Sequence, residues 1–222
     1  MPVKASACRL ALLLALDISS SVDATEDALQ RGGLAQALIA QDVQDAFFSS
    51  PDPVALAAYE WSGRYNQALL VSWTLIETPA DLLSVARQIS TTPRGHNDFP
   101  TALGYALGFG ATVFDTAPAC LFQTLDVSGD GENNDGFGPA EAYAAFQFDD
   151  ITVNGLAIDT TGQGQSAALV QYYQSVVIRG PAAFVEVADG FSDYERAMRR
   201  KLIRELSAQI LGSVTTGSGA EG

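Results

Sequence analysis

The sequence has few basic residues and few charged residues of any kind. Only 12 of its 222 residues are Lys or Arg, against 26 Asp or Glu, which gives a formal net charge of -14 at pH 7. Such a surface repels a phosphate backbone, so we expect no nucleic-acid partner. The longest uncharged apolar run near the start, Leu10 to Leu16, has seven residues, whereas a membrane-spanning helix needs about 20. The sequence therefore predicts no transmembrane helix.

Cysteine is also scarce. Cys8 and Cys120 are the only two cysteines, so one disulfide at most can form. Their number alone does not distinguish a disulfide from two buried thiols or a weak metal site.

The start of the chain can be interpreted in two ways. Lys4 and Arg9, followed by Leu10 to Leu16, imitate the charged and apolar regions of a secretory signal peptide. We favour the interpretation that Arg9 to Leu16 form a strand and are not part of a signal peptide, because the run continues directly into Asp17 and the serines that follow it. Residues 1-7 are then a leader or the remnant of a signal peptide, residues 8-211 one domain, and residues 212-222 a flexible Gly, Ser and Thr tail.

Apolar strand-like runs alternate with helix-like stretches along the domain. This order predicts an α/β domain with a mainly parallel sheet buried on both faces. The runs Val54 to Trp61 and Gln67 to Ile76 are joined by only five residues, so they form a hairpin that gives the sheet one antiparallel edge. Asp23 to Glu26 has the pattern of a capping box that begins a helix to about Ile39. The other predicted strands are Cys120 to Val127, Ile151 to Ile158 and Ala183 to Ala188, and the other predicted helices are Pro79 to Ile89, Thr101 to Phe114, Pro139 to Phe146, Ser166 to Tyr173 and a terminal helix that includes Met198, Leu202, Leu206 and Ile210.

Polar residues follow several of the predicted strands. Asp17, Ser19 and Ser21 follow the first strand, Thr101 follows the polar loop at 91-100, and Asp130 follows the Cys120 strand. Ligands bind open parallel sheets at the carboxyl ends of strands, so these side chains are the candidates for a site. Carboxylates and hydroxyls are hard oxygen donors, which suit Mg²⁺ better than the nitrogen and sulfur ligands typical of zinc.

These residues resemble a known family. The pattern Asp17-x-Ser19-x-Ser21, then Thr101 about 80 positions later, then Asp130-Gly131, looks like the metal-ion-dependent adhesion site (MIDAS) of von Willebrand factor type A domains. The predicted elements also follow that family's order over nearly the whole chain. The resemblance implies an α/β fold with an open, mostly parallel six-strand sheet and helices on both faces. More narrowly, the sequence is similar to a bacterial group of such domains without an assigned function.

The resemblance implies a site and an activity. Ser19 and Ser21 would bind Mg²⁺, or Ca²⁺ or Mn²⁺ in its place, Thr101 would bind it directly or through water, and Asp17 and Asp130 would hold coordinated waters. An acidic residue of a partner protein would complete the coordination of the ion. The domain would then be an adhesion-type binding module. We expect it to be monomeric and to lack a catalytic constellation.

The resemblance also bears on the cysteines. Cys8 lies nine residues before Asp17 and Cys120 ten before Asp130, and in the resembled fold their strands are neighbours about 4.8 Å apart. A Cys8 to Cys120 disulfide is then expected, together with a periplasmic or secreted location. Unpaired thiols in a cytoplasmic protein are the alternative.

Three other interpretations compete for the same residues. Asp126, Ser128 and Asp130 match the front of an EF-hand loop, but Phe137 stands where the bidentate Glu is required. A Mg²⁺-dependent phosphohydrolase or phosphotransferase could use Asp17 as nucleophile, yet Ser19 stands where such enzymes usually carry a second acid. A Ser-His-acid hydrolase would need His96, the only histidine, without a Gly-x-Ser-x-Gly elbow. His96 is therefore predicted to be a loop residue, which with its neighbours could flank the entrance to the metal.

Basic residues gather in the terminal helix. Five of the twelve lie within nine positions, namely Arg196, Arg199, Arg200, Lys201 and Arg204. They could bind anionic lipid or an acidic partner. We favour a solvated face that offsets the acidic surface and whose side-chain stems cover apolar area.

Overall fold

A computed structural model of the chain describes residues 8-160 and 166-216. Its centre is a six-stranded sheet in the order β3-β2-β1-β4-β5-β6. Every neighbouring pair is parallel except β2 and β3, as predicted for the α/β fold with one antiparallel edge. The strands are β1 (Cys8–Asp17), β2 (Val54–Trp61), β3 (Gln67–Ile76), β4 (Cys120–Gly129), β5 (Ile151–Ile158) and β6 (Val185–Ala188).

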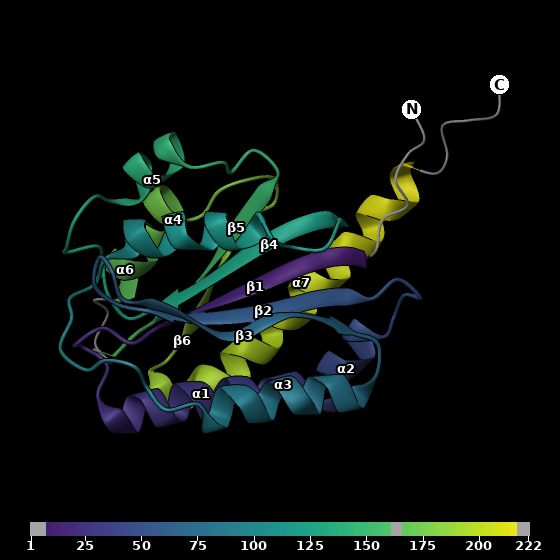
Figure 1. Cartoon of the computed structure of the whole chain (residues 1–222), viewed down its shortest axis with the longest axis horizontal. Coiled ribbons are helices and arrows are strands. Elements are labelled where there is room, and N and C mark those ends of the chain that lie inside the picture. The colour runs from purple at the N-terminus through teal and green to yellow at the C-terminus, as the bar shows by residue number, and fades with distance from the viewer. Residues whose placement is uncertain (1–7, 161–165, 217–222) are drawn as a thin grey trace.

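Helices cover both faces of the sheet (Figure 1). One face carries α1 (Ala24–Ile39), α2 (Gln41–Phe47), α3 (Pro79–Thr91) and α7 (Tyr194–Thr216), with a short 3-10 turn at Phe191–Asp193 before α7. The other face carries α4 (Leu103–Phe114), α5 (Pro139–Ala145), α6 (Ser166–Tyr172) and the π-helix η1 (Tyr173–Val177).

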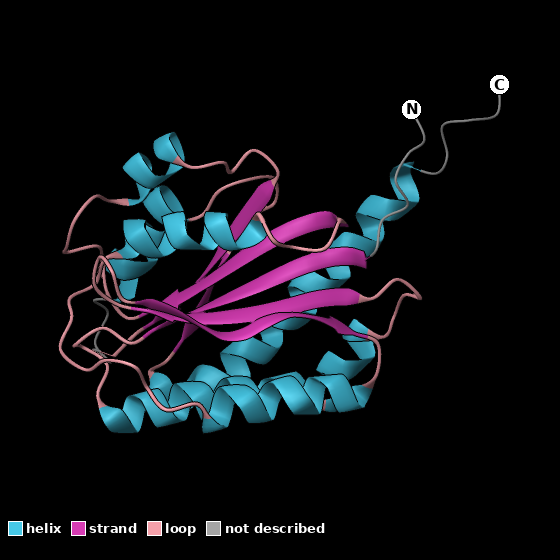
Figure 2. Cartoon of the chain, in the orientation of Figure 1, coloured by secondary structure: helices cyan, strands magenta, loops and turns pink. Residues whose placement is uncertain are grey.

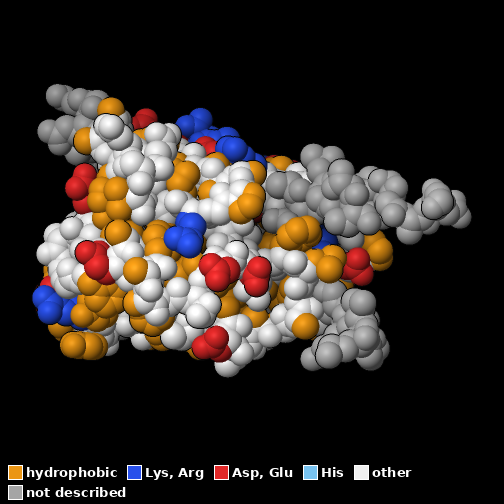
Figure 3. Space-filling model, turned by 90° about the horizontal axis from the view of Figure 1, so that it is seen from above, with side chains coloured by type: hydrophobic (Ala, Val, Ile, Leu, Met, Phe, Trp, Pro, Cys, Tyr) orange, Lys and Arg blue, Asp and Glu red, His pale blue; other side chains and the backbone are white. Residues whose placement is uncertain are grey.

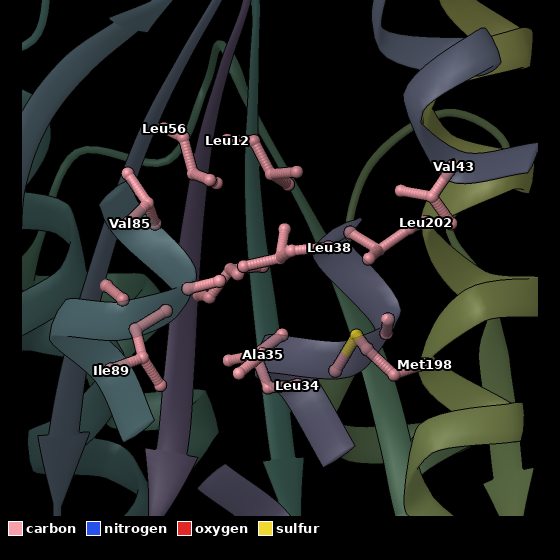
Figure 4. Packing of buried hydrophobic residues seen from close by; sticks show 14 of the residues in the cluster. Leu12, Leu34, Ala35, Leu38, Val43, Leu56, Val85, Ile89, Met198 and Leu202 are labelled. Carbon is pink, nitrogen blue, oxygen red and sulfur yellow. The ribbon is translucent and has the colours of Figure 1, made fainter. Parts of the chain in front are cut away.

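Strand β1 runs through the middle of the molecule and is buried along its whole length. Alternate side chains enter two separate cores, because successive residues of a strand point to opposite faces. Leu10, Leu12, Leu14 and Leu16 belong to the core beneath α1, α3 and α7, whereas Ala11, Leu13 and Ala15 belong to the core on the α4 side. Figure 4 shows the first core, where Leu12 and Leu56 of the sheet meet helix residues such as Leu38 and Leu202. Burial on both faces explains why the segment is a continuous apolar run.

Local signals set several element boundaries. The side chain of Asp23 accepts hydrogen bonds from the backbone N–H groups of Thr25 and Glu26, and Glu26 accepts one from the N–H of Asp23. This is the capping box predicted for the start of α1. Strands β2, β3 and β5 have the predicted bounds.

Other elements differ from the predictions. Helix α2 was not predicted, because only Val43 and Phe47 of its seven residues are buried. Helix α4 begins at Leu103 and not at Thr101, since the Thr101 carbonyl accepts hydrogen bonds from Asn134 and Asp135. Helix α7 continues to Thr216, into the segment predicted as a tail, whereas the predicted leader and residues 217-222 lie outside the described residues.

The first residues of β1 and β4 are joined by a disulfide. Cys8 and Cys120 are directly paired in the parallel register, with Cα atoms 4.5 Å apart, and the bridge expected from the resemblance is present. In the described part of the chain, no helix combines the length and the apolar character needed to cross a membrane.

The loops that follow the parallel strands lie together at the end of the sheet opposite the disulfide. Strands β1 and β4 are neighbours although a long stretch of chain separates them, so the strand order reverses between them. The arrowheads of the parallel strands point towards a group of loops at the left of Figure 2. A ligand of an open α/β sheet is expected in this position.

Candidate metal site

The site is built on the loop that follows β1. The backbone N–H of Ser19 donates to Oδ1 of Asp17 at 2.7 Å, which turns the chain sharply after the strand. The hydroxyl oxygens of Ser19 and Ser21 lie 3.1 Å apart. Asp17 and Ser19 are completely buried, at 0% exposure, whereas Ser21 is exposed. The loop therefore presents its oxygen atoms along a path from the interior to the solvent.

Asp130, directly after β4, meets this loop. The Ser21 hydroxyl donates to Oδ1 of Asp130 at 2.8 Å. Four of the five predicted site residues, Asp17, Ser19, Ser21 and Asp130, are thus joined by consecutive hydrogen bonds. Segments more than a hundred residues apart converge here because β1 and β4 are paired.

Thr101 lies beside the same loop. It is buried at 3% exposure, and its Oγ1 lies 3.7 Å from the position that a Cβ atom on Gly131 would occupy. Its backbone N–H donates to Oδ1 of Asn134 at 2.9 Å, and its carbonyl accepts the N–H of Asn134 at 2.9 Å. Within the described residues its hydroxyl makes no hydrogen bond to the other four site residues, although the backbone contacts hold it against the Asp130 loop.

Burial dominates the electrostatics of the two carboxyl groups. Burial, followed by the negative charge of Asp130, raises the pKa of Asp17 to about 7, against the opposing effect of the Ser19 hydrogen bonds and the Arg94 charge. Burial also raises the pKa of Asp130. Both carboxyl groups therefore lie in surroundings that disfavour their negative charge unless a cation is nearby.

Arg94, in the polar loop at 91-100, holds the loop after β1 in place. Its guanidinium donates to the carbonyls of Ile18 at 2.7 Å, Ser19 at 3.1 Å and Val22 at 2.7 Å. Gln30 of α1 adds a hydrogen bond to the carbonyl of Asp17 at 2.8 Å. Neither residue could be predicted from the sequence, because their partners are backbone carbonyls, which have no sequence signature.

The donor set fits a small hard cation. In an octahedral Mg²⁺ site with metal–oxygen distances of about 2.1 Å, neighbouring ligand oxygens are about 3.0 Å apart, close to the 3.1 Å between the Ser19 and Ser21 hydroxyl oxygens. Oδ2 of Asp17 is buried and lacks a hydrogen-bond partner in the described part of the chain. No cluster of three or more His, Cys, Asp or Glu suited to a metal ion occurs among the described residues, and the oxygen donors gathered here are hydroxyls with two carboxylates beside them.

The polar loop at 91-100 adjoins the site as well. The backbone N–H of Ser20 donates to the carbonyl of Phe99 at 2.8 Å, and the Phe99 ring packs edge-on against His96 with centroids 5.1 Å apart. His96 is exposed. A role of His96 at the entrance stays a prediction.

The EF-hand interpretation is wrong. Asp126 and Ser128 belong to β4 and are buried. Ser128 Oγ lies 3.1 Å from the Tyr194 hydroxyl, and Asp126 forms an ion pair with Lys201 at 2.6 Å. Both side chains therefore face α7, away from the oxygen atoms of Ser21 and Asp130.

The prediction of a solvated basic face on the terminal helix is wrong for Lys201. It is completely buried, between Asp126 and Glu205, with Glu205 Oε1 at 2.7 Å. The four arginines of the run have local partners. Arg196 pairs with Asp193, Arg199 with Asp42 and Glu195, and Arg200 with Glu186, and Arg204 lies over the Phe184 ring. On the face shown in Figure 3, several Lys or Arg side chains gather at the upper edge, and other charged side chains of both signs lie scattered among hydrophobic ones.

Comparison with known proteins identifies the family and the fold. A family described as "Protein of unknown function (DUF1194)" matches residues 7–210. A search of curated proteins finds no match. Solved structures with the same fold include proximal thread matrix protein 1 from the mussel byssus, at 16% identity and a TM-score of 0.63 over 91% of this chain and 49% of that one.

Two further structures are informative. The mussel protein with a zinc-occupied MIDAS motif aligns at 15% identity and a TM-score of 0.61 over 91% of this chain and 48% of its own. A von Willebrand factor type A protein from Catenulispora acidiphila aligns at 15% identity and a TM-score of 0.61, covering 90% of this chain and 43% of that one. The chain thus spans about half the length of these structures. They confirm the fold predicted from the sequence resemblance.

Proposed function

This chain belongs to the DUF1194 family and has the von Willebrand factor type A fold, and from that premise we propose that it binds another protein through a divalent cation. The cation is Mg²⁺, which Ca²⁺ or Mn²⁺ can replace. The residues that hold it are Asp17, Ser19, Ser21, Thr101 and Asp130.

The five residues have different roles in this proposal. The Ser19 and Ser21 hydroxyls bind the cation, and Thr101 binds it directly or through water. Asp17 and Asp130 hold coordinated waters. The observation that carries the proposal is a run of hydrogen bonds between the carboxyl ends of two neighbouring strands. The backbone N–H of Ser19 donates to Asp17, and the Ser19 and Ser21 hydroxyls continue the run to Asp130.

The arrangement favours binding over catalysis. Neutral hydroxyls leave most of the positive charge on the cation, so a carboxylate from outside is an effective additional ligand. Ser21 is exposed and Asp130 half-buried, so this side of the site is accessible to a partner. We therefore propose that an acidic residue of the partner completes the site.

The phosphohydrolase alternative has weaker support. Its nucleophile, Asp17, is completely buried, and its Oδ1 already accepts the N–H of Ser19. A phosphate group could not reach this carboxylate without rearrangement of the loop. Turnover of a generic phosphate ester with Mg²⁺, lost in Asp17→Ala, would support the enzyme and reject the binding module.

Calorimetry with Mg²⁺ tests the site. We expect Ser19→Ala and Thr101→Ala to weaken Mg²⁺ binding while the protein remains folded. Thr124→Ala is the matched control, because Thr124 is equally buried, at 1% exposure, but lies within β4. Unchanged binding in both site variants would contradict the proposal, and capture of a partner with and without chelator would test the function itself.

The disulfide supports a location outside the reducing cytoplasm. Cys8 and Cys120 are paired, and disulfides persist mainly in oxidising compartments. We propose a periplasmic or secreted protein. Fractionation of the producing cells would test this, and recovery in the cytoplasm would contradict it.

A further inference from the structure

Tyr173 lies directly behind the site and has no role in the proposal above. It is completely buried, at 0% exposure, at the first position of η1. A Cβ atom on Gly155 of β5 would lie 2.6 Å from Cδ1 of the Tyr173 ring. Glycine at position 155 therefore makes room for this ring against the sheet.

A second glycine makes room for the hydroxyl. A Cβ atom on Gly129 would lie 2.7 Å from the Tyr173 hydroxyl oxygen and 2.8 Å from Oδ2 of Asp17. Both oxygens therefore lie against the same side of Gly129, at the end of β4. Any other residue at this position would separate the phenol from the carboxylate.

Both of these oxygens lack a partner. The Tyr173 hydroxyl and Oδ2 of Asp17 are buried and make no hydrogen bond within the described part of the chain. Buried polar atoms without partners are costly and rare in native proteins, so two of them beside one glycine require an explanation. Burial, and next the charge of Asp17, raises the pKa of the Tyr173 phenol well above its usual value, so the phenol keeps its proton and remains a donor.

The π-helix sets the position of this side chain. The N–H of Ile178 donates to the carbonyl of Tyr173 at 3.0 Å, and the Tyr143 hydroxyl donates to the carbonyl of Val177. The neighbouring Tyr172 hydroxyl accepts the N–H of Asn133 at 3.2 Å, in the loop after Asp130. Single π-helical turns are rare and frequently occur at functional sites.

We propose that Tyr173 is a positioning residue of the cation site, whose hydroxyl donates a hydrogen bond to Oδ2 of Asp17, directly or through one water, when the cation is bound. This inference rests on the proposed function. The hydrogen bond holds the carboxylate in the orientation in which it serves the coordinated waters. Tyr173 itself does not bind the cation.

Calorimetry with Mg²⁺ on Tyr173→Phe tests this role. We expect affinity at least about tenfold weaker, since hydrogen bonds to charged groups have effects of this size, and no loss of thermal stability in chelator, because the deleted hydroxyl has no partner. Tyr59→Phe is the matched control. Tyr59 is equally buried, and its hydroxyl donates to the carbonyl of Ala106 at 2.8 Å, so this variant should lose stability and keep its affinity.

A spectroscopic measurement separates positioning from a structural role. Mg²⁺ should produce a tyrosine ultraviolet difference spectrum in the wild type and in Tyr59→Phe but not in Tyr173→Phe. Wild-type protein that binds no Mg²⁺ would refute the proposed function. Wild type and Tyr173→Phe that bind Mg²⁺ equally would refute only the role of Tyr173. If Tyr173→Phe does not fold, the test is the Mg²⁺-induced difference spectrum of Tyr59→Phe. The absence of a tyrosine signal in that spectrum would overturn the role proposed for Tyr173.

Discussion

The pH dependence of Mg²⁺ binding tests the environment of Asp17 most directly. Burial and the neighbouring Asp130 raise the pKa of Asp17 to about 7, far above the usual 3.8. The proposed role of Asp17 requires its carboxylate form, so protons compete with the cation. Affinity should therefore rise with pH through this range.

The size of the effect follows from the pKa. At pH 6 about one Asp17 in eleven is ionised and at pH 8 about ten in eleven, so affinity should increase about tenfold, or about 1.4 kcal/mol. A carboxylate with the usual pKa would be ionised at both pH values and would give no change. The raised pKa of Asp130 acts in the same direction.

Titration calorimetry at pH 6, 7 and 8 measures how the Mg²⁺ affinity changes with pH. Asp17→Asn should lose most of the pH dependence, whereas Ser19→Ala should bind more weakly and keep it. Equal wild-type dissociation constants at pH 6 and pH 8 would refute the reasoning.

The same shift affects the metal-free fold with the opposite sign. An acid whose pKa is raised by folding stabilises the fold below its unfolded pKa, and this contribution is lost as the pH rises through the folded value. For Asp17 the loss between about pH 4 and pH 7 is at most about 4 kcal/mol. Burial also raises the pKa of Asp126 to about 7, so urea unfolding in chelator should be compared between the wild type and Asp17→Asn to isolate the part due to Asp17.

Three further predictions concern the disulfide, Arg94 and Lys201. Reduction of the Cys8–Cys120 disulfide, which spans a sequence separation of 112, should lower the free energy of unfolding by up to about 5 kcal/mol in the chain-entropy model. Urea unfolding measures this loss, and two reactive thiols in the unfolded, unreduced protein would contradict the bridge. Arg94→Ala removes the donors to three loop carbonyls and should weaken Mg²⁺ binding about tenfold. Arg94→Lys should not restore binding, because one ammonium lacks the planar fork, and wild-type affinity in both variants would be inconsistent with this role. Lys201→Met leaves two buried carboxylates without their cation and should destabilise the fold by about 3–5 kcal/mol with unchanged Mg²⁺ affinity. A stable variant would show that the buried ion pair contributes little.

Elements with strong local signals could be predicted closely. Strands β2, β3 and β5 are apolar runs bounded by turn residues, and α1 begins with a capping box. Helix α2 carries too few apolar residues to show a period, and its position depends on packing against α1 and α7 (Figure 1). The burial of Lys201 could not be predicted either, because a lysine in a basic run gives no indication that Asp126 and Glu205 surround it in the fold.

The α/β fold, the family resemblance and the five candidate site residues could be predicted from the sequence alone. Apolar periodicity and polar residues after strands are local properties, so they can be identified along the chain. The groups that support these residues became visible with the folded chain, where Arg94 and Gln30 donate to backbone carbonyls and Tyr173 lies behind Asp17. Such contacts depend on the pairing of β1 with β4 and on glycines that leave space for the Tyr173 ring. The distances between residues far apart in the sequence cannot be read from a linear pattern.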